Sequence, residues 1–155
     1  MDPFQLLKKD HKKVSDLLKR LDNTEEKDAS TREELFAQVK NELEIHTQIE
    51  EDIFYPALKE KEETKEITLE AYEEHNAVKT LLQELEETDK DDETWGAKLT
   101  VLKENVEHHV EEEEGEMFNK AKKALNEDER EALGDRMNEA KGQVGAEGSE
   151  DEDEE

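Results

Sequence analysis

The two halves of the chain repeat one another at helical spacing. Moving the sequence by 64 positions places six residues on identical partners: His11, Val14, Leu17, Leu18, Leu21 and Thr24. Moving it by 63 positions does the same for three more: His46, Glu50 and Glu51. Matching residues spaced three and four apart predict that both halves form the same helical unit.

Apolar spacing predicts four amphipathic helices, over residues 3–21, 30–56, 67–87 and 95–125. Short polar connections make each half a helical hairpin. Two such hairpins predict an all-α fold, an up-down-up-down four-helix bundle over residues 1–125. A short accessory helix is expected over 126–141. The final segment, 142–155, has no periodicity and mounting negative charge, and we expect a disordered acidic tail.

Polar residues stand inside each of the predicted apolar stripes. The stripe of the second helix consists of Leu35 or Phe36, Val39, Leu43, His46, Glu50, Ile53 and Ala57. The stripe of the fourth helix contains His109 and Glu113 in the same way, and the first and third helices contribute His11 and His75. Six polar side chains are therefore expected to converge on the axis of the bundle.

Burying four imidazoles and two carboxylates costs several kcal/mol unless these groups are paired. Only 31% of the residues are apolar, so the core has little stabilisation to offset that cost. A metal ion removes most of it. The predicted metal ligands are His11, His46, Glu50, His75, His109 and Glu113.

The ligand types narrow the choice of metal. With no cysteine in the chain, imidazole and oxygen ligands favour iron, with manganese and zinc as alternatives. Six ligands are too many for one tetrahedral zinc, whereas carboxylates can bridge two ions about 3.5–4 Å apart. The sequence therefore predicts two metal ions, with Glu50 and Glu113 as candidate bridges.

Simpler interpretations compete at each position. A single histidine in an apolar stripe is usually a core residue, and it is the repeat of four that favours metal binding. His108 lies about 100° around the helix from His109, which predicts a surface position. Glu51 and Glu114 are interpreted as part of a solvated face. Tyr55 is expected to pack beside the helices or to hydrogen-bond a ligand.

Four segments resemble the hemerythrin-like, or HHE cation-binding, family: DH at 10–11, HTQIEEDIFYPAL at 46–58, EEH at 73–75 and HVEEEEGEMF at 109–118. The resemblance covers roughly residues 4–125. It implies an up-down four-helix bundle with two iron ions in an oxo- or hydroxo-bridged di-iron centre. It also implies that the centre binds dioxygen or reacts with peroxide or nitric oxide, through the six ligands named above.

One departure from the family pattern bears on the activity. Oxygen-carrying hemerythrins have a second histidine on the third helix, but Ala71 and Lys79 stand one turn on either side of His75. The resemblance therefore favours oxygen or iron sensing, iron storage or peroxide chemistry over reversible oxygen carriage.

Composition limits the other functions. A formal charge of -26 repels phosphate backbones and anionic lipids, so neither nucleic acid nor membrane is an expected partner. No signal peptide or spanning segment is predicted, and a cytoplasmic location is expected. Without a serine, cysteine or phosphate-loop motif, any enzymatic activity belongs to the metal. The alternatives are an iron-storage or iron-sensing module without turnover, and an acidic scaffold whose histidines are structural.

Overall fold

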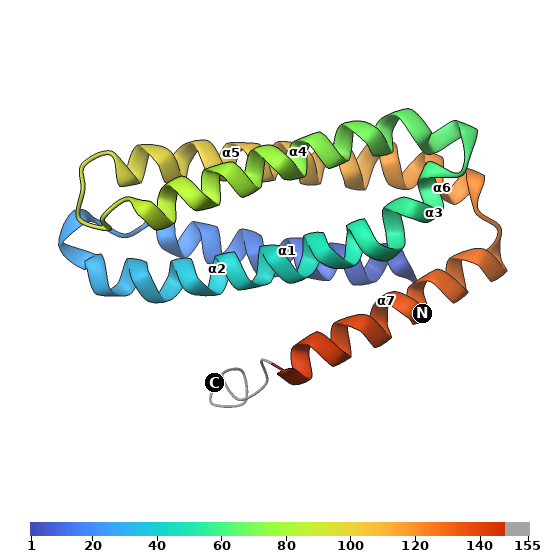
Figure 1. Ribbon diagram of the computed structural model, residues 1–155, viewed down its shortest axis with the longest axis horizontal. Coiled ribbons are helices and arrows are strands. Elements are labelled where there is room, and N and C mark those ends of the chain that lie inside the picture. Colours follow the sequence, from blue (N-terminus) through green and yellow to red (C-terminus); the bar gives the residue numbers. More distant parts are fainter. Residues whose placement is uncertain (148–155) are drawn as a thin grey trace.

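The computed structural model describes residues 1–147 and is all-helical over that range, as expected (Figure 1). The elements in chain order are α1 (Pro3–Asp22), η1 (Glu26–Asp28), α2 (Ala29–Ile49), η2 (Glu50–Phe54), α3 (Tyr55–Lys59), α4 (Glu62–Glu87), α5 (Trp95–Glu112), η3 (Glu113–Met117), α6 (Phe118–Ala124) and α7 (Glu127–Glu147). Of these, η1 is a 3-10 turn, while η2 and η3 are π-helical turns.

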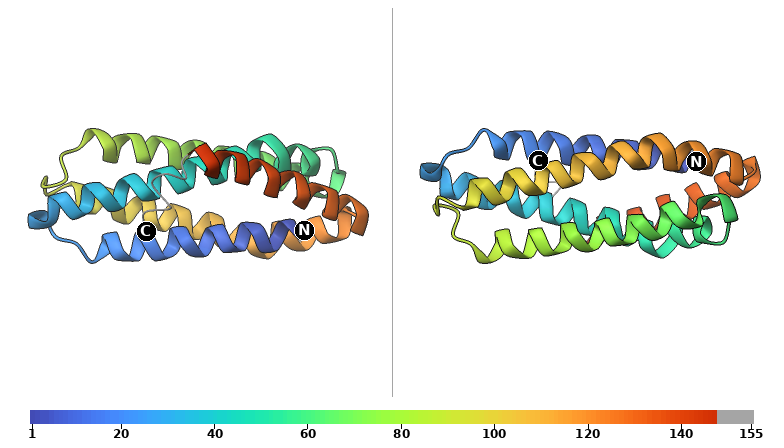
Figure 2. Two further views of the ribbon diagram at one scale, coloured as in Figure 1. Left: turned by 90° about the horizontal axis from the view of Figure 1, so that it is seen from below. Right: turned by 90° about the horizontal axis from the view of Figure 1, so that it is seen from above.

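Four long helical rods lie side by side along one axis (Figures 1 and 2). Two of them are α1 and α4. The other two are continuous runs, α2-η2-α3 over 29–59 and α5-η3-α6 over 95–124. α1 packs against α2 and α4 packs against α5, so the two helices of each half contact one another. Contacts of α1 with α5 and of α4 with α3 join the halves.

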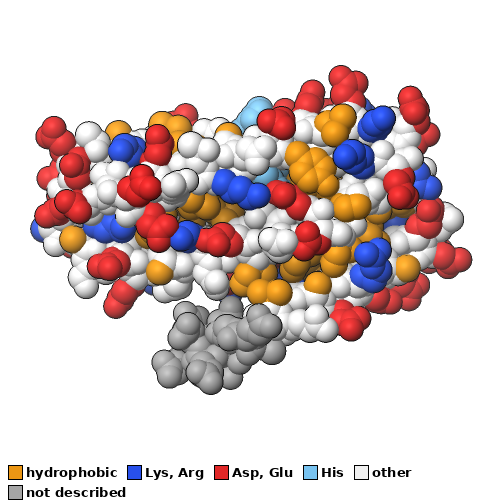
Figure 3. All heavy atoms as spheres, in the orientation of Figure 1, with side chains coloured by type: hydrophobic (Ala, Val, Ile, Leu, Met, Phe, Trp, Pro, Cys, Tyr) orange, Lys and Arg blue, Asp and Glu red, His pale blue; other side chains and the backbone are white. Residues whose placement is uncertain are grey.

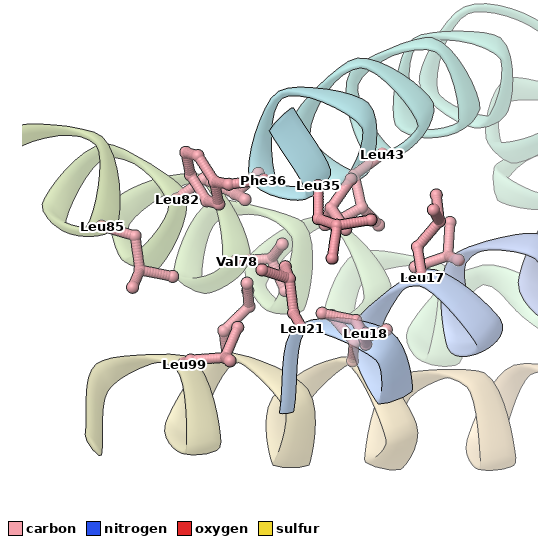
Figure 4. Close-up of a cluster of buried hydrophobic side chains, with 14 of the residues drawn as sticks. Leu17, Leu18, Leu21, Leu35, Phe36, Leu43, Val78, Leu82, Leu85 and Leu99 are labelled. Carbon is pink, nitrogen blue, oxygen red and sulfur yellow. The ribbon is translucent and has the colours of Figure 1, made fainter. Parts of the chain in front are cut away.

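Two apolar cores fill the interior, one toward each end of the rods. The first is built from four rods and includes Leu17, Leu18, Leu21, Leu35, Phe36, Leu43, Val78, Leu82, Leu85 and Leu99 (Figure 4). Trp95 closes this core, since its buried indole nitrogen donates to the carbonyl of Leu85 at 3.0 Å. The second includes Phe4, Leu7, Ile49, Phe54, Tyr55, Leu58, Phe118, Leu133 and Met137.

The π-helical turns shift the register of the apolar stripe. The sequence pattern predicts that Ile53 and Ala57 face the core, but both are only partly buried. Phe54 and Leu58 are fully buried in their place, one residue later in each case. A π turn adds one residue to the helical repeat, which rotates the following residues by about 100°. The prediction from regular α-helical spacing was therefore wrong after Glu50.

α4 begins at Glu62, five residues before the predicted start at Ile67. Two threonines in its first turns are fully buried, and both satisfy their hydroxyls on backbone carbonyls. Thr64 donates to Leu58 and Thr68 donates to Thr64 at 2.6 Å. These polar residues interrupt the apolar pattern, which is why the pattern alone places the start too late.

α7 is longer than the predicted helix over 126–141, because it continues to Glu147. Gly142 was expected to end it, but no glycine in the described range has a positive φ, so Gly142 does not form a left-handed cap. A helical glycine costs only about 1 kcal/mol relative to alanine. The remainder of the predicted disordered tail, residues 148–155, lies outside the described range.

α7 folds back over α1, α2 and η2 (Figure 2). Leu133 and Met137 are buried in the second core. Gly134 lets the N-terminal backbone approach closely, because a Cβ atom there would stand 1.9 Å from the carbonyl oxygen of Met1. The Met1 amino group also pairs with Asp135 at 3.1 Å. The part of α7 that contains Leu133 and Met137 is thus packed against the rods.

Across residues 1–147 the structure has no helix with both the length and the apolar character needed to cross a membrane.

Candidate metal centre

All six predicted ligands come together where the two cores meet. Along its own rod, each predicted ligand histidine lies between a residue of one core and a residue of the other. His11, for example, lies between Leu7 of the second core and Val14 of the first. His46 lies in the last turn of α2, between Leu43 and Ile49, and Glu50 follows it one turn later at the start of η2. All six side chains are buried, with 0–7% of each residue exposed: His11, His46, Glu50, His75, His109 and Glu113.

The six side chains form two overlapping sets of four, and in each set the ligand atoms lie within 4.8 Å of one another. One set consists of His11, His46, Glu50 and Glu113, and the other of His75, His109, Glu50 and Glu113. The carboxylates of Glu50 and Glu113 belong to both sets. A carboxylate in that position can bridge two cations.

The distances show how evenly the carboxylates are shared. Oε1 of Glu50 lies 3.1 Å from Nε2 of His46 and 3.1 Å from Nε2 of His75. Glu113 reaches Nε2 of His11 at 3.1 Å through Oε1 and Nε2 of His109 at 3.2 Å through Oε2. All four imidazoles therefore present the same ring nitrogen to the space between the carboxylates.

Several of these atoms have no hydrogen-bond partner although they are fully buried. They are Nε2 of His11, Nε2 of His46, both carboxylate oxygens of Glu50 and Oε1 of Glu113. An unsatisfied buried polar group costs about 1–3 kcal/mol. Metal ions between the imidazoles and carboxylates would satisfy all five atoms at once, so the residues present fit a pair of cations.

Each ligand glutamate is the first residue of a π-helical turn, Glu50 in η2 and Glu113 in η3. Such turns occur frequently at functional sites in helices. Here the wider turn lets the glutamate face the centre while the residues that follow return to the second core. Phe54 and Met117, at the ends of the two turns, are both buried there.

The outer nitrogen of every ligand histidine is held by an acidic side chain. Nδ1 of His11 contacts Glu114 at 2.6 Å, and Nδ1 of His75 contacts Glu51 at 2.7 Å. The other two contacts are His46 to Asp10 at 3.1 Å and His109 to Glu74 at 2.8 Å. A proton on Nδ1 that is donated to a carboxylate leaves the Nε2 lone pair free for a cation and fixes the orientation of the ring.

These outer carboxylates correct the interpretation of the acidic runs. Glu51 and Glu114 are not merely part of a solvated face, since each binds a ligand histidine. Asp10 and Glu74 were not predicted at all. The repeat itself contains the signal, because Asp10 and Glu74 are related by the same 64-residue shift as the histidines that follow them.

Tyr55 distinguishes one half of the centre from the other. Its buried hydroxyl donates to Oε2 of Glu113 at 2.6 Å and lies 3.1 Å from Nε2 of His75. The repeat-related residue in the second half is Phe118, whose ring stacks on His11 with centroids 6.5 Å apart. The two potential metal positions thus have different neighbours, a phenol beside one and an apolar ring beside the other.

The pKa values of two of the histidines show how charge is distributed in the centre when no cation is bound. Burial alone would lower the pKa of His46, but the Glu50 carboxylate and the hydrogen bond to Asp10 raise it to about 10. Burial opposes the charge of His109 in the same way, and hydrogen bonds to Glu113 and Glu74 raise its pKa to about 11. Without metal, protonated imidazoles therefore balance the buried carboxylates.

All four of these histidines line a small cavity. Its volume is about 20 Å³, close to what one water molecule or a diatomic molecule needs. Apart from the four ligand histidines, its lining is mainly apolar: Val14, Leu43, Thr47, Val78, Val106 and Val110. The third helix adds no further imidazole, since Ala71 is buried in the second core and Lys79 pairs with Glu51 at 3.4 Å.

Two comparisons with known proteins bear on the family and the fold of the chain. The family model described as the hemerythrin HHE cation binding domain matches residues 2–121. The structure is similar to the crystal structure of a hemerythrin HHE cation binding domain-containing protein from Mycobacterium kansasii, with 26% sequence identity and a TM-score of 0.82. That similarity covers 93% of this chain and 87% of the other. No curated protein matches the chain.

Proposed function

The chain belongs to the hemerythrin HHE cation-binding family, and on that premise we propose that it is a non-haem di-iron protein that handles a small ligand. The ligand is dioxygen, peroxide or nitric oxide. The observation that carries the proposal is the pair of buried sets sharing Glu50 and Glu113, with unsatisfied polar atoms aimed between them.

The six side chains divide the work of holding two ions. His11 and His46 would hold one ion and His75 and His109 the other, and Glu50 and Glu113 belong to both sets. Iron held there would supply redox chemistry toward small oxygen or nitrogen ligands, which mixed imidazole and carboxylate ligation without sulfur suits. The outer carboxylates keep each imidazole in the tautomer that presents Nε2.

The cavity limits what reaches the centre. With about 20 Å³ available, it admits a diatomic molecule or peroxide and excludes larger substrates. Its valine and leucine side chains keep bulk water away from the imidazoles. Since the third helix provides no extra histidine at Ala71 or Lys79, sensing, storage or peroxide chemistry is favoured over reversible carriage.

Tyr55 holds a proton at the centre. Burial and the neighbouring carboxylates of Glu113 and Glu50 raise the pKa of the Tyr55 hydroxyl well above its usual range. The phenol therefore stays protonated and donates to Oε2 of Glu113, which fixes the orientation of that carboxylate. The other half of the centre, beside Phe118, has no such donor in the described contacts.

We further propose the finer organisation that the sequence predicts. Residues 1–125 act as an up-down-up-down four-helix bundle that contains the centre, and α7 is an accessory helix packed on its outside. The side-by-side rods and the burial of Leu133 and Met137 support this division.

Metal content per chain, measured on protein purified without chelator, tests the proposal when paired with an absorption spectrum between about 300 and 600 nm. We expect two irons per chain and a band in that range that changes on addition of peroxide or nitric oxide. A chain that takes up no iron under anaerobic ferrous loading would overturn the proposal, and the histidines would then be structural.

A further inference from the structure

The repeat-related carboxylates Asp10 and Glu74 have opposite surroundings on their outer sides. Each accepts the Nδ1 proton of a ligand histidine through one oxygen. The other oxygen of Asp10 is paired with the ammonium group of Lys141 on α7. In the part of the chain that the structure describes, Glu74 has no lysine or arginine partner.

Glu74 faces a histidine and a second carboxylate instead. Nε2 of His108 lies 4.0 Å from Oε2 of Glu74 and 3.3 Å from Oε1 of Glu112. One ligand atom from each of the three side chains lies within 4.8 Å of the other two. Two neighbouring carboxylates repel one another unless a cation lies between them.

We propose that Glu74, His108 and Glu112 form a third metal site, at the surface, which takes a divalent transition-metal ion and feeds the buried centre. The ion takes the place at Glu74 that the Lys141 ammonium takes at Asp10. One imidazole and two carboxylates suit ferrous iron, manganese or zinc better than magnesium or calcium, which favour oxygen ligands alone.

The spacing within the site repeats that of the buried ligands. His108 and Glu112 are four residues apart on one face of α5, as are His109 and Glu113 one residue further along. Glu74 on α4 completes the site from the neighbouring rod. The same pair of helices therefore carries one set of ligands inward and a second set outward.

The site is open to water and adjacent to the centre. The His108 side chain is 67% exposed, and Glu112 is 42% exposed. In the view of Figure 3, histidine side chains reach the surface among acidic side chains. Glu74 joins the surface to the interior, because its Oε1 accepts from Nδ1 of the buried ligand His109 at 2.8 Å. Only the Glu74 carboxylate would thus separate an ion on the surface site from His109, a predicted ligand of the buried centre. The feeding role rests on the proposed function.

Calorimetric titration with Zn²⁺ tests the site in the full chain, after the buried centre has been filled. We expect wild type to bind one further Zn²⁺ per chain and His108→Ala and Glu112→Gln to bind it at least tenfold more weakly. Glu111→Gln removes the same charge from an exposed position of α5 outside the site, and should bind as wild type does. Equal affinity in wild type and His108→Ala, or equal weakening in Glu111→Gln, would overturn the site.

Two more readouts separate this inference from the proposed function. In NMR spectra, the ring signals of His108 should shift on adding Zn²⁺ even in a variant whose buried centre does not load. Uptake of ferrous iron into the buried centre should be several-fold slower in His108→Ala, with the final iron content unchanged. Equal uptake rates would overturn the feeding role, whereas absence of buried iron in wild type would overturn the proposed function alone.

Discussion

Removing the metal should lower the stability of the fold, and the number of buried polar atoms left without a partner determines by how much. Five polar atoms of the centre are buried without a hydrogen-bond partner. In the metal-free protein a proton on Nε2 of His46 pairs that atom with Oε1 of Glu50, which leaves three unsatisfied atoms. At about 1–3 kcal/mol each, these three cost about 3–9 kcal/mol when no cation is bound. Even the lower figure raises the melting temperature of a domain of this size by about 6–12 °C on loading. We therefore expect an increase of at least about 6 °C between the chelated and the iron-loaded protein.

Thermal unfolding followed by circular dichroism, under anaerobic conditions with and without saturating ferrous iron, measures this difference. The double variant Glu50→Gln, Glu113→Gln is the control, because it keeps the size of both bridging side chains and removes the charges that bind both ions. Its melting temperature should not respond to iron. A wild-type protein that contains iron and yet melts within about 2 °C of the chelated protein would refute the reasoning, since the unsatisfied atoms would then not be the source of the stabilisation.

Three further results are expected. His11→Ala should retain one metal ion per chain by elemental analysis and Glu50→Ala should retain none, because His11 belongs to one set and Glu50 to both. In metal-free protein, the pKa of His109 is about 11, against about 6.5 when unfolded. The stability that this difference contributes is complete below pH 6.5 and is lost as the pH rises toward 11, so the free energy of unfolding measured in urea should fall over that range. Gly134→Ala should lower that free energy by about 1–3 kcal/mol at neutral pH, because the added Cβ meets the backbone of Met1.

The sequence predicted the parts of the site that depend on spacing within one helix. His46 and Glu50 are four residues apart on a continuous helical face, and the repeat relates them to a second pair, so their convergence followed from the pattern. The outer carboxylates depend on contacts between helices. Asp10 reaches His46 across α1 and α2, and a charged residue next to a histidine does not by itself indicate that contact.

The errors in the fold have similar physical causes. A π turn adds one residue to the helical repeat. The apolar spacing is therefore regular before the turn and regular after it, but it does not continue across the turn. Ile53 was therefore assigned to the core in place of Phe54. The early start of α4 involves two buried threonines, whose local preference is overridden by packing. The late end of α7 involves Gly142, an exposed glycine that remains helical.

The division of ligands between the halves has a consequence for the origin and the engineering of such chains. Residues 1–59 contribute His11, His46 and Glu50, and the second half likewise contributes two histidines and one glutamate from its own pair of helices. Each half supplies both imidazoles of one set and one carboxylate that also belongs to the other set. Two copies of one ancestral hairpin would assemble the same set as a homodimer, and duplication with fusion would then free each copy to diverge. Tyr55 in one half and Phe118 in the other are a difference of the kind that such divergence would produce. A chain cut between the hairpins should reassemble only when the ions are there to join its halves.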